Sequence, residues 1–573
     1  TGYTTMVTAP GGAAINGVHH LLDEVLIHAG TKLYRLAVAA GGAWSLTAIG
    51  NMADARSRSF VFDGKLYLLD GTAYRVYDGA ALSLVSAHAT VPTIIISRRP
   101  TGGGQAYKGL NLLGRKWTES FLGTEKDTVY QLTTAGLDSD AVTAEVLDAN
   151  GVWVAKTEGA DFTVDRAAGK VTFKTAPGES PVTGQDNVHI TAVKTRDGYL
   201  DSINQCSLAA VYGVGGSTDR VFLSGNAGKP GVDYYSEFED PAFFPDVNYT
   251  KLARDGGEIK GYAVLNNALA AFISGSSDGR NVVVRSGSLD ADGNAVFRII
   301  NTIIGQDAVA TDSFCQTDKE PLFLTDRGVY AITAEELTGE RYSQERSYYI
   351  GSALRAAAGR PEASACIYGD FYVLALDGTL YLLDTQQKTY ERNSPASSYQ
   401  YECYCWPDIP ARVVFTDAEG ALCFGTAAGK LCRFSTAADD PQAYNDDGDP
   451  IDAYWETADY DGELFFRVKT FTGIAVRLAA SPVTGVTVHA RVRGLWQQVY
   501  DAKGKARYFD YTYVNFGKIS FSADKTPRTL YGKIKLKKVD KVAFRLQNNE
   551  NNEPFGLYAF GVQWKESGGN YKR

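Results

Sequence analysis

The chain has 573 residues, of which 44% are hydrophobic and 21% charged, and its formal net charge is −9. This length exceeds the range over which one hydrophobic core keeps growing, so we expect two to four domains. A net acidic chain is not expected to coat nucleic acid non-specifically, because such binding needs a basic surface that displaces counterions from phosphates. The 34 Tyr, 26 Phe and 59 Gly favour pleated strands joined by tight turns.

No apolar run is long enough to span a membrane, and no charged start followed by an apolar stretch marks an export leader. We therefore expect a soluble protein that is made in the cytoplasm. The first five residues lack an initiator Met and have the pattern of a strand, which indicates that a segment upstream is missing or removed.

Short alternating runs around a glycine recur along the chain, and each has the pattern of a β-hairpin. These runs are Val25–Tyr34, Leu66–Tyr74, Leu322–Tyr330, Tyr372–Tyr381 and Leu422–Leu431, with looser copies around Gly228 and Gly279. Most of the turn glycines are 41 to 51 residues apart. Because this is the period of a propeller blade, we predict an all-β chain that contains a six- or seven-bladed β-propeller.

One gap interrupts the repeat, because 157 residues separate Gly71 from Gly228. This distance predicts a domain inserted between the second and third units. Its expected strands are 144–148, 161–165, 170–174 and 188–193, a pattern typical of a small immunoglobulin-like β-sandwich. We therefore assign residues 1–104 and 199–440 to the propeller and residues 105–198 to the insertion.

The stretch Tyr234–Tyr249 is too aromatic for an ordinary exposed loop, and two prolines interrupt it. Such a segment either caps a blade or packs on a partner. Its six rings are candidate partner-interface residues: Tyr234, Tyr235, Phe238, Phe243, Phe244 and Tyr249.

Helix is scarce in the predicted secondary structure. The best candidate is Ser352–Ala358, which Gly359 would end, and a turn is expected over residues 334–337.

Seven cysteines form an odd, unevenly spread set, which favours reduced, mostly buried thiols over a disulfide framework. They are Cys206, Cys315, Cys366, Cys403, Cys405, Cys423 and Cys432. The last four could be grouped as a zinc site, but their spacing differs from that of paired C-x-x-C knuckles, so buried thiols are favoured.

The repeat ends near residue 440, and residues 441–573 are predicted to form a C-terminal β-sandwich with longer strands. The turn cluster Asn445–Pro450 offers carboxylates that could bind a cation, although it lacks the spacing of an EF-hand, and a solvated turn is favoured. Further on, Lys533, Lys535 and Lys537 alternate with apolar residues along one strand. They either meet DNA or an acidic subunit, or form the solvated face of an edge strand, which is the favoured interpretation.

The residues that catalysis would require do not occur in suitable patterns, so we expect no enzyme. The six histidines form no H-x-x-H or H-E-x-x-H motif, and His28 and His189 alternate within predicted strands as structural residues do. No nucleophile elbow and no phosphate-binding loop is present. Ser288–Gly293 is loosely similar to the aspartate box of sialidases, but a polar turn is favoured. The acids around the aromatic stretch could pair for glycoside hydrolysis: Asp233, Glu237, Glu239 and Asp240.

Three segments resemble propeller proteins of tailed-phage virions. Asp219–Asn226 followed by Tyr234–Tyr249 is similar to their pattern R-hydrophobic-[FW]-x-S-G, then Y-Y-S-E-x-x-D-P-x-x-F-P-x-x-N-Y. Residues 15–36 are similar to their first blade, and Asp446–Thr457 with Lys469–Thr470 is similar to the entry into their C-terminal sandwich. The resemblance implies the tail nozzle or tail-hub (stabilisation) class of short-tailed phages.

For this chain the resemblance implies a homo-oligomeric ring, with a hexamer expected, in the virion tail. The ring would extend the portal-adaptor channel, contact other virion proteins such as the tail fibre or spike, and let double-stranded DNA pass through its lumen without sequence-specific binding. No catalytic residue, cofactor or metal is carried over. Two alternatives stay open: a carbohydrate-binding or carbohydrate-cleaving propeller on a phage tail or cell surface, and an extracellular adhesion module.

Overall fold

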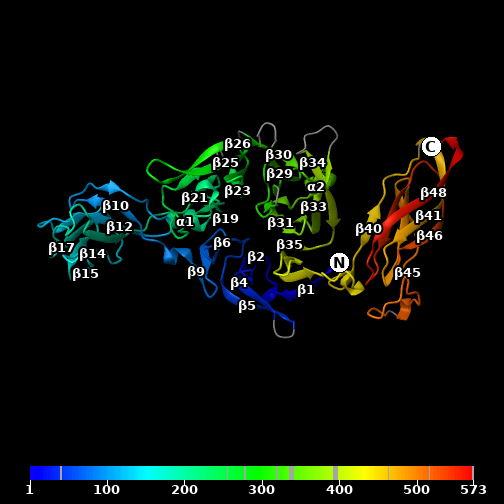
Figure 1. Cartoon of the computed structure of the whole chain (residues 1–573), viewed down its shortest axis with the longest axis horizontal. Helices are drawn as coiled ribbons and strands as arrows, with labels where there is room; N and C mark the ends of the chain where they lie inside the picture. The colour runs from blue at the N-terminus through cyan, green and yellow to red at the C-terminus, as the bar shows by residue number, and fades with distance from the viewer. Residues whose placement is uncertain are drawn as a thin grey trace. The chain divides into compact units, whose positions relative to one another are not determined.

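The computed structural model describes residues 1–38, 42–253, 256–276, 279–317, 320–334, 341–390, 398–462, 464–514 and 516–570. The described chain is mostly β-strand, as predicted (Figure 1). Its α-helices are α1 (Tyr199–Asn204) and α2 (Gly351–Ala356), and α2 confirms the predicted helix. The turn expected over residues 334–337 lies outside the described residues, apart from Ala334 at the end of a strand. No helix in the described part of the chain is long and apolar enough to cross a membrane.

Strands between Tyr3 and Phe434 form seven four-stranded sheets. The first two are β2 (Ile15–Leu21), β3 (Glu24–Ala29), β4 (Lys32–Val38) and β5 (Trp44–Asn51), then β6 (Arg58–Phe62), β7 (Lys65–Leu69), β8 (Tyr74–Tyr77) and β9 (Leu82–Leu84). The third and fourth are β19 (Leu208–Val211), β20 (Val221–Ser224), β21 (Val232–Tyr235) and β22 (Tyr249–Lys251), then β23 (Glu258–Leu265), β24 (Ala268–Ser274), β25 (Arg280–Leu289) and β26 (Ala295–Ile304). The fifth and sixth are β27 (Cys315–Gln316), β28 (Pro321–Leu324), β29 (Val329–Ala334) and β30 (Arg341–Glu345), then β31 (Ser364–Tyr368), β32 (Phe371–Leu376), β33 (Thr379–Tyr390) and β34 (Tyr399–Trp406).

The seventh sheet combines the start of the chain with strands near residue 430. Its order is β1-β37-β36-β35, with β1 (Tyr3–Thr8), β35 (Ala411–Thr416), β36 (Leu422–Thr426) and β37 (Lys430–Phe434). The carboxylate of Asp447 accepts hydrogen bonds from the backbone N–H of Thr5 at 3.0 Å and from its hydroxyl at 2.9 Å. The turn cluster that offered carboxylates for a cation therefore helps to hold β1 in place.

The first strands of successive sheets lie side by side, which defines a β-propeller. β35 packs on β2, β2 on β6, β6 on β19 and β19 on β23, while β27 packs on β31 and β31 on β35. Figure 1 shows the same neighbours, with β2 next to β6 and β35. Apolar side chains fill the space between neighbouring sheets, as in the cluster of Leu324, Leu354, Tyr372 and Tyr401 between the fifth and sixth.

Each predicted turn glycine lies between the second and third strands of one sheet. Gly30, Gly71, Gly279, Gly378 and Gly429 have φ between +52° and +79°, the left-handed region that glycine adopts without a Cβ penalty. The repeat thus marks the same turn in every sheet, and its looser copy at Gly228 follows Asn226, whose side-chain oxygen accepts the Gly228 N–H at 2.9 Å.

The segment between the second and third sheets folds as two facing sheets with a shared core. One sheet has the order β11-β10-β12-β18-β14-β15 and the other β13-β17-β16. Buried Trp117, Phe121, Tyr130 and Phe162 come from both sheets. The strands are β10 (Thr93–Arg98), β11 (Gln105–Ala106), β12 (Lys116–Phe121), β13 (Val129–Gln131), β14 (Thr143–Leu147), β15 (Trp153–Thr157), β16 (Phe162–Asp165), β17 (Lys170–Phe173) and β18 (Val188–Val193).

The structure corrects the expected start of this insertion at residue 105. β10 pairs in parallel with β12 of the insertion, so residues 93–98 belong to its sheet and not to the propeller. The apolar run Ile94-Ile95-Ile96 has the pattern of a blade strand, and a parallel partner that lies later in the chain leaves no local signal.

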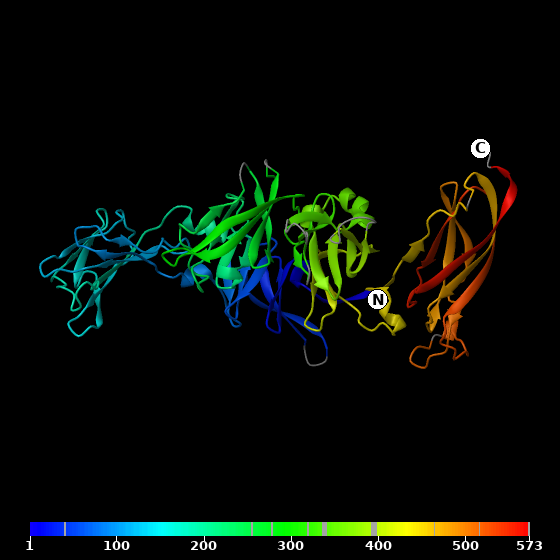
Figure 2. The same ribbon diagram turned by 45° about the horizontal axis from the view of Figure 1, so that its top comes forward.

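The C-terminal strands also form a two-sheet sandwich, with the orders β40-β47-β43-β44 and β46-β41-β48 (Figure 2). Phe471, Val488, Leu536 and Phe544 lie in the core between the two sheets. The strands are β40 (Ala453–Glu456), β41 (Arg467–Leu478), β43 (Thr487–Val492), β44 (Leu495–Asp501), β46 (Arg528–Val539), β47 (Ala543–Asn548) and β48 (Leu557–Asn570), with the short pairs β38 (Asn445–Asp446) and β39 (Asp449–Pro450), and β42 (Val483–Thr484) and β45 (Ala506–Arg507). The chain as a whole divides into two compact units: Thr1–Thr8, Ala421–Cys423 and Leu431–Arg573, and Ala9–Gly420 with Phe424–Lys430.

Candidate functional site

Most rings of the aromatic stretch fill the interior of the chain. Tyr234, Phe243 and Phe244 are 4%, 5% and 0% exposed. The Phe244 ring lies edge-on to Tyr74 of the second sheet, with centroids 6.2 Å apart. Tyr235 is half-buried and meets Phe297 of the fourth sheet at 4.9 Å. The three buried residues cap the third sheet against its neighbours and are not available to an outside partner, whereas Tyr235 stays partly exposed.

Two rings of the stretch do reach the surface. Phe238 is 55% exposed and lies 5.5 Å from the Arg220 guanidinium, and Tyr249 is 56% exposed. Of the six candidate partner-interface residues, Phe238 and Tyr249 are thus the exposed ones. Sequence alone could not separate the buried rings from the exposed ones, because most of the segment is the loop between β21 and β22, without a period of two or 3.6 residues.

The same stretch holds a loop of the insertion, between β11 and β12. The Leu112 N–H donates to the Phe244 carbonyl at 2.9 Å, and the Phe244 N–H donates to the Asn111 side-chain oxygen at 3.1 Å. The Leu110 N–H donates to an Asp246 carboxylate oxygen at 3.1 Å, and the Asp246 N–H returns a bond to the Leu110 carbonyl at 2.8 Å. The aromatic segment is therefore the anchor by which the third sheet fixes residues 110–112.

The predicted lysine stripe lies on β46, where exposed and buried residues alternate. Lys533, Lys535 and Lys537 are exposed, whereas Ile534 and Leu536 are buried in the sandwich core. β46 is an edge strand of its sheet, as the favoured interpretation of the stripe requires. No ion pair among the described residues includes any of these three lysines.

A groove runs beside this stripe, between the edge strands β44 and β46 of the two facing sheets. Its volume is about 520 Å³, and its lining consists of Thr472, Gln497, Gln498, Val499, Lys533, Ile534, Lys535 and Leu536. Amide and ammonium groups dominate the lining, and it contains no carboxylate or imidazole. The groove offers hydrogen-bond donors and positive charge, but no group that could act as a general base or nucleophile.

Arginines from the second and seventh sheets converge near the propeller axis. Arg58 at the start of β6 donates to Asp312, which precedes β27, at 2.6 Å, and Arg56 lies 3.7 Å from the same carboxylate. Arg56 also donates to the carbonyl of Arg412 on β35 at 2.7 Å, and Arg412 donates to the carbonyl of Ile15 on β2 at 3.1 Å. Burial lowers the pKa of Arg56. These bonds join the first strands of four sheets, or the residues just before them. Side chains therefore occupy the axis where these bonds form.

Two buried histidines form a chain of hydrogen bonds in the first two sheets. His28 Nε2 lies 2.9 Å from the Gly30 carbonyl, which can only accept, so this nitrogen is the donor and Nδ1 accepts from the Ser57 hydroxyl at 2.8 Å. The Ser57 oxygen then accepts from His19 Nε2 at 2.8 Å, and His19 Nδ1 accepts from the Ser59 hydroxyl at 2.8 Å. Burial lowers the pKa of His19 to about 3 and lowers that of His28. Both rings are neutral and structural, as predicted for His28.

Three of the four carboxylates considered for glycoside hydrolysis have structural partners, whereas the fourth, Glu239, is exposed. Asp233 is fully buried and paired with Arg285, and Glu237 forms an ion pair with Lys108 at 3.0 Å. Asp240 accepts from the Thr90 hydroxyl at 2.6 Å. In the loop similar to an aspartate box, an Asp290 carboxylate oxygen accepts the N–H groups of Asp292 and Asn294, which is the predicted polar turn.

The cysteines are free in the structure, and burial raises the pKa of several of them, including Cys403 to about 12. A protonated thiol is a poor zinc ligand, because the thiolate is the form that binds metal. Within the described ranges, no group of three or more His, Cys, Asp or Glu residues could hold a metal ion.

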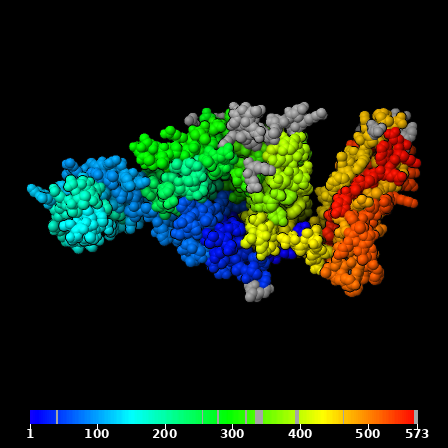
Figure 3. All heavy atoms as spheres, in the orientation of Figure 1, coloured from blue at the N-terminus to red at the C-terminus, as the bar shows by residue number. Residues whose placement is uncertain are grey.

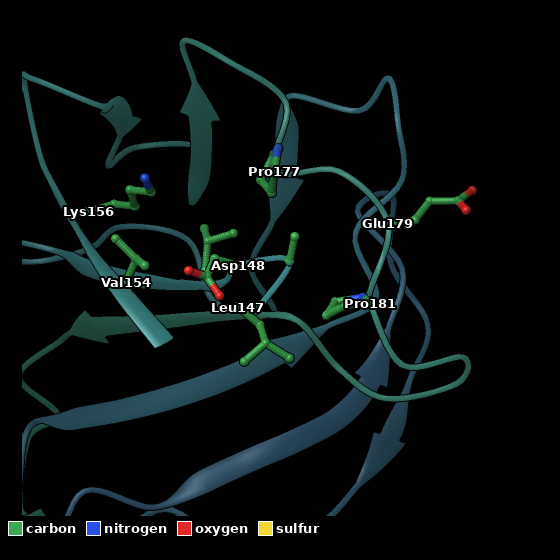
Figure 4. A pocket seen from close by; sticks show the side chains of 9 residues that line it. Leu147, Asp148, Val154, Lys156, Pro177, Glu179 and Pro181 are labelled. Atoms are coloured by element: carbon green, nitrogen blue, oxygen red, sulfur yellow. The ribbon is translucent and has the colours of Figure 1, made fainter. Parts of the chain in front are cut away.

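A second surface pocket, of about 390 Å³, lies in the insertion (Figure 4). Its lining is Val146, Leu147, Asp148, Ala149, Val154, Lys156, Pro177, Glu179 and Pro181. Figure 4 shows Glu179 pointing away from the pocket, whereas Leu147 and Asp148 lie at its centre. Asp148 caps a turn by accepting the Asn150 and Val152 N–H groups, so it is not free to act on a ligand.

No protein-family model matches the chain, and no curated protein matches it. Among solved structures, it is similar to a streptogramin B lyase (9% identity, TM-score 0.31), covering 75% of this chain and 95% of that one. It is also similar to the Neurospora crassa Pan2 WD40 domain (6%, 0.34, covering 75% and 94%) and to the WD40 β-propeller domain of Doa1 (10%, 0.32, covering 76% and 98%). At these TM-scores the likenesses add no argument, and the strand order alone carries the assignment as a β-propeller.

Proposed function

We propose that this chain is a structural subunit of a phage virion tail, in the nozzle or hub ring that extends the portal-adaptor channel. The observation that carries the proposal is the segment 219–249. Its phage-like motif coincides with β20, β21 and the aromatic anchor that fixes the inserted sandwich to the propeller. In this proposal the seven sheets are seven blades, the insertion is an immunoglobulin-like decoration, and the ring is a hexamer.

The stiffness of a closed propeller supports a structural role in the wall of a channel. The described residues also form no set of side chains suited to catalysis. Blades that close on one another resist deformation, and His28, Glu237 and Asp233 are held in structural bonds. Because the arginines and Asp312 occupy the propeller axis, DNA would pass between subunits, through a lumen that the assembled ring encloses.

The test is electron microscopy of the purified chain, alone and mixed with portal-adaptor particles. The proposal expects closed rings with an open lumen, stacked on the adaptor end of those particles. A chain that stays monomeric at high concentration and does not join the particles would refute it. A glycan array and a hydrolysis screen on the same preparation address the carbohydrate alternative, for which binding or cleavage without ring formation would be the result.

A further inference from the structure

Charge is divided unequally along this chain. Residues 453–570, from β40 to β48 of the C-terminal sandwich, contain 18 Lys and Arg against 11 Asp and Glu, whereas residues 1–452 contain 37 against 55. The sequence therefore pairs a basic sandwich with an acidic remainder within one polypeptide. Two such chains attract each other when the basic part of one meets the acidic part of the next.

The basic charge gathers on the outer face of the sheet β46-β41-β48. Lys533, Lys535 and Lys537 follow one another at about 6.8 Å, the advance of two strand residues. Arg477 on β41 and Lys565 on β48 are exposed as well, and Lys565 points outward because its neighbour Trp564 packs on Phe471 of the core at 6.3 Å. β48 is the red segment on the surface in Figure 3. We call these five cations the basic sheet face.

Gly473 and Ala475 lie at the centre of this face. Gly473 pairs with Lys533 and Gln563, and Ala475 pairs with Gly561 and with Tyr531, whose side chain is 78% exposed. No ion pair among the described residues includes any cation of the basic sheet face. Its charge is thus not compensated by an ion pair within the described part of the chain, and the exposed Tyr531 ring lies two residues from Lys533 on the same strand.

A complementary surface exists on the propeller. The first strands of a propeller run in one direction, so the turns after the first and third strands of each sheet share one face. Exposed carboxylates occupy several of these turns and form no ion pair in the described structure: Asp23, Asp63, Asp78, Asp292 and Asp370. We call them the acidic turn face.

We propose that the basic sheet face of one copy binds the acidic turn face of a second copy. This proposal rests on the ring assembly proposed above and names its contact. The two surfaces differ, so the contact is head-to-tail, and contacts of this kind close into a ring when the rotation between copies divides a full turn. A second copy is favoured over nucleic acid, because the complementary charge is on the same polypeptide while the net charge of −9 repels phosphates.

The experiment measures oligomer size of the full chain by mass photometry and sedimentation velocity at 50, 150 and 500 mM salt. We expect the triple variant K533E/K535E/K537E to shift the midpoint for ring formation to at least tenfold higher protein concentration at 150 mM salt. The charge-conserving variant K533R/K535R/K537R keeps the wild-type midpoint. The control K503E/K505E/K525E reverses three exposed lysines elsewhere in the same sandwich and also keeps it. Circular dichroism verifies that each variant is folded.

A second reversal separates a specific contact from a loss of solubility. Adding D23K, D292K and D370K to the triple lysine variant makes the two faces opposite in sign again, so we expect ring formation to return toward the wild-type midpoint. If the wild type forms rings and the triple lysine variant forms them at the same concentration, this inference is overturned and the proposed function stays intact. Failure of the second reversal to restore rings, or a loss of DNA binding with rings unchanged, would also overturn it. A wild-type chain that forms no ring would refute the proposed function itself.

Discussion

Acidification should loosen the first two sheets of the propeller through His19. The pKa of this buried histidine is about 3, against 6.5 for an exposed one, because burial disfavours the imidazolium. Its neighbours Ser57 and Ser59 also favour the neutral ring. In that form Nδ1 accepts a hydrogen bond from the Ser59 hydroxyl, whereas a protonated Nδ1 would be a donor and would disrupt this series of hydrogen bonds.

The sign follows from proton linkage. Below pH 6.5 the unfolded segment binds a proton at His19 while the folded segment does not, so stability is complete above pH 6.5 and falls as the pH drops toward 3. At pH 5 the solution is 1.5 units below the unfolded-state pKa of 6.5. This difference corresponds to about 2 kcal/mol or a 30-fold change in the opening equilibrium. The pKa of His28 is lowered as well, so it adds to the loss in the same direction.

Hydrogen exchange detects this loss locally, which matters because a chain with several domains does not unfold in one step. After correction for intrinsic rates, amide protection in β2 and β3 should fall at least 30-fold between pH 7.5 and pH 5, while protection in β17 of the insertion changes less. His19→Gln should flatten this pH dependence, and His88→Gln, which removes an exposed histidine, should not. An equal pH dependence in wild type and His19→Gln would refute the reasoning.

Three further substitutions test the packing and the buried charges. Phe244→Ala should cost about 3–5 kcal/mol because its ring is fully buried, whereas Phe238→Ala should stay within about 0.5 kcal/mol, both measured by hydrogen exchange in β20 and β21; equal effects would contradict the burial described. Glu320→Ala should cost about 3–5 kcal/mol, measured by hydrogen exchange in β28, because it leaves the buried Arg346 guanidinium without its carboxylate, and a neutral result would show that the pair is not buried. Asp312→Ala should increase hydrogen exchange in β6 by about one to two orders of magnitude, corresponding to about 1–3 kcal/mol for the unpaired arginines, and unchanged exchange would contradict the axial network.

The repeat was predictable because each sheet carries its own local signal. Gly30, Gly71 and Gly378 stand in a fixed position between alternating strands, and a tight turn needs its glycine whatever the rest of the chain does. The gap after Gly71 predicted an insertion for the same reason. By contrast, β10 joined a sheet through a parallel partner, and such pairing leaves no mark in the neighbouring residues.

The candidate surfaces were also predictable where the signal is local, and not where it depends on residues distant in the sequence. Strand alternation predicted correctly that Lys535 is exposed and Ile534 buried, because side chains of a strand alternate between its two faces. Burial of Phe244 depends on Asn111 and Tyr74, which are more than a hundred positions away, so no local pattern could reveal it. The arginines on the propeller axis likewise come from sheets that are distant in sequence, and each alone has the appearance of a surface residue.

The seventh sheet imposes an order on synthesis. β1 precedes the other described strands but pairs with β37, about 420 residues later. During translation this strand must therefore wait, unpaired, until the ribosome has added the residues that form β37. At 5–20 residues per second the wait lasts about 20–80 seconds. An unpaired strand edge invites pairing with other chains, so the protein is exposed to misassembly during this interval. The seventh sheet likewise stays incomplete until β37 has been made. A chain truncated before β37 therefore cannot complete this sheet.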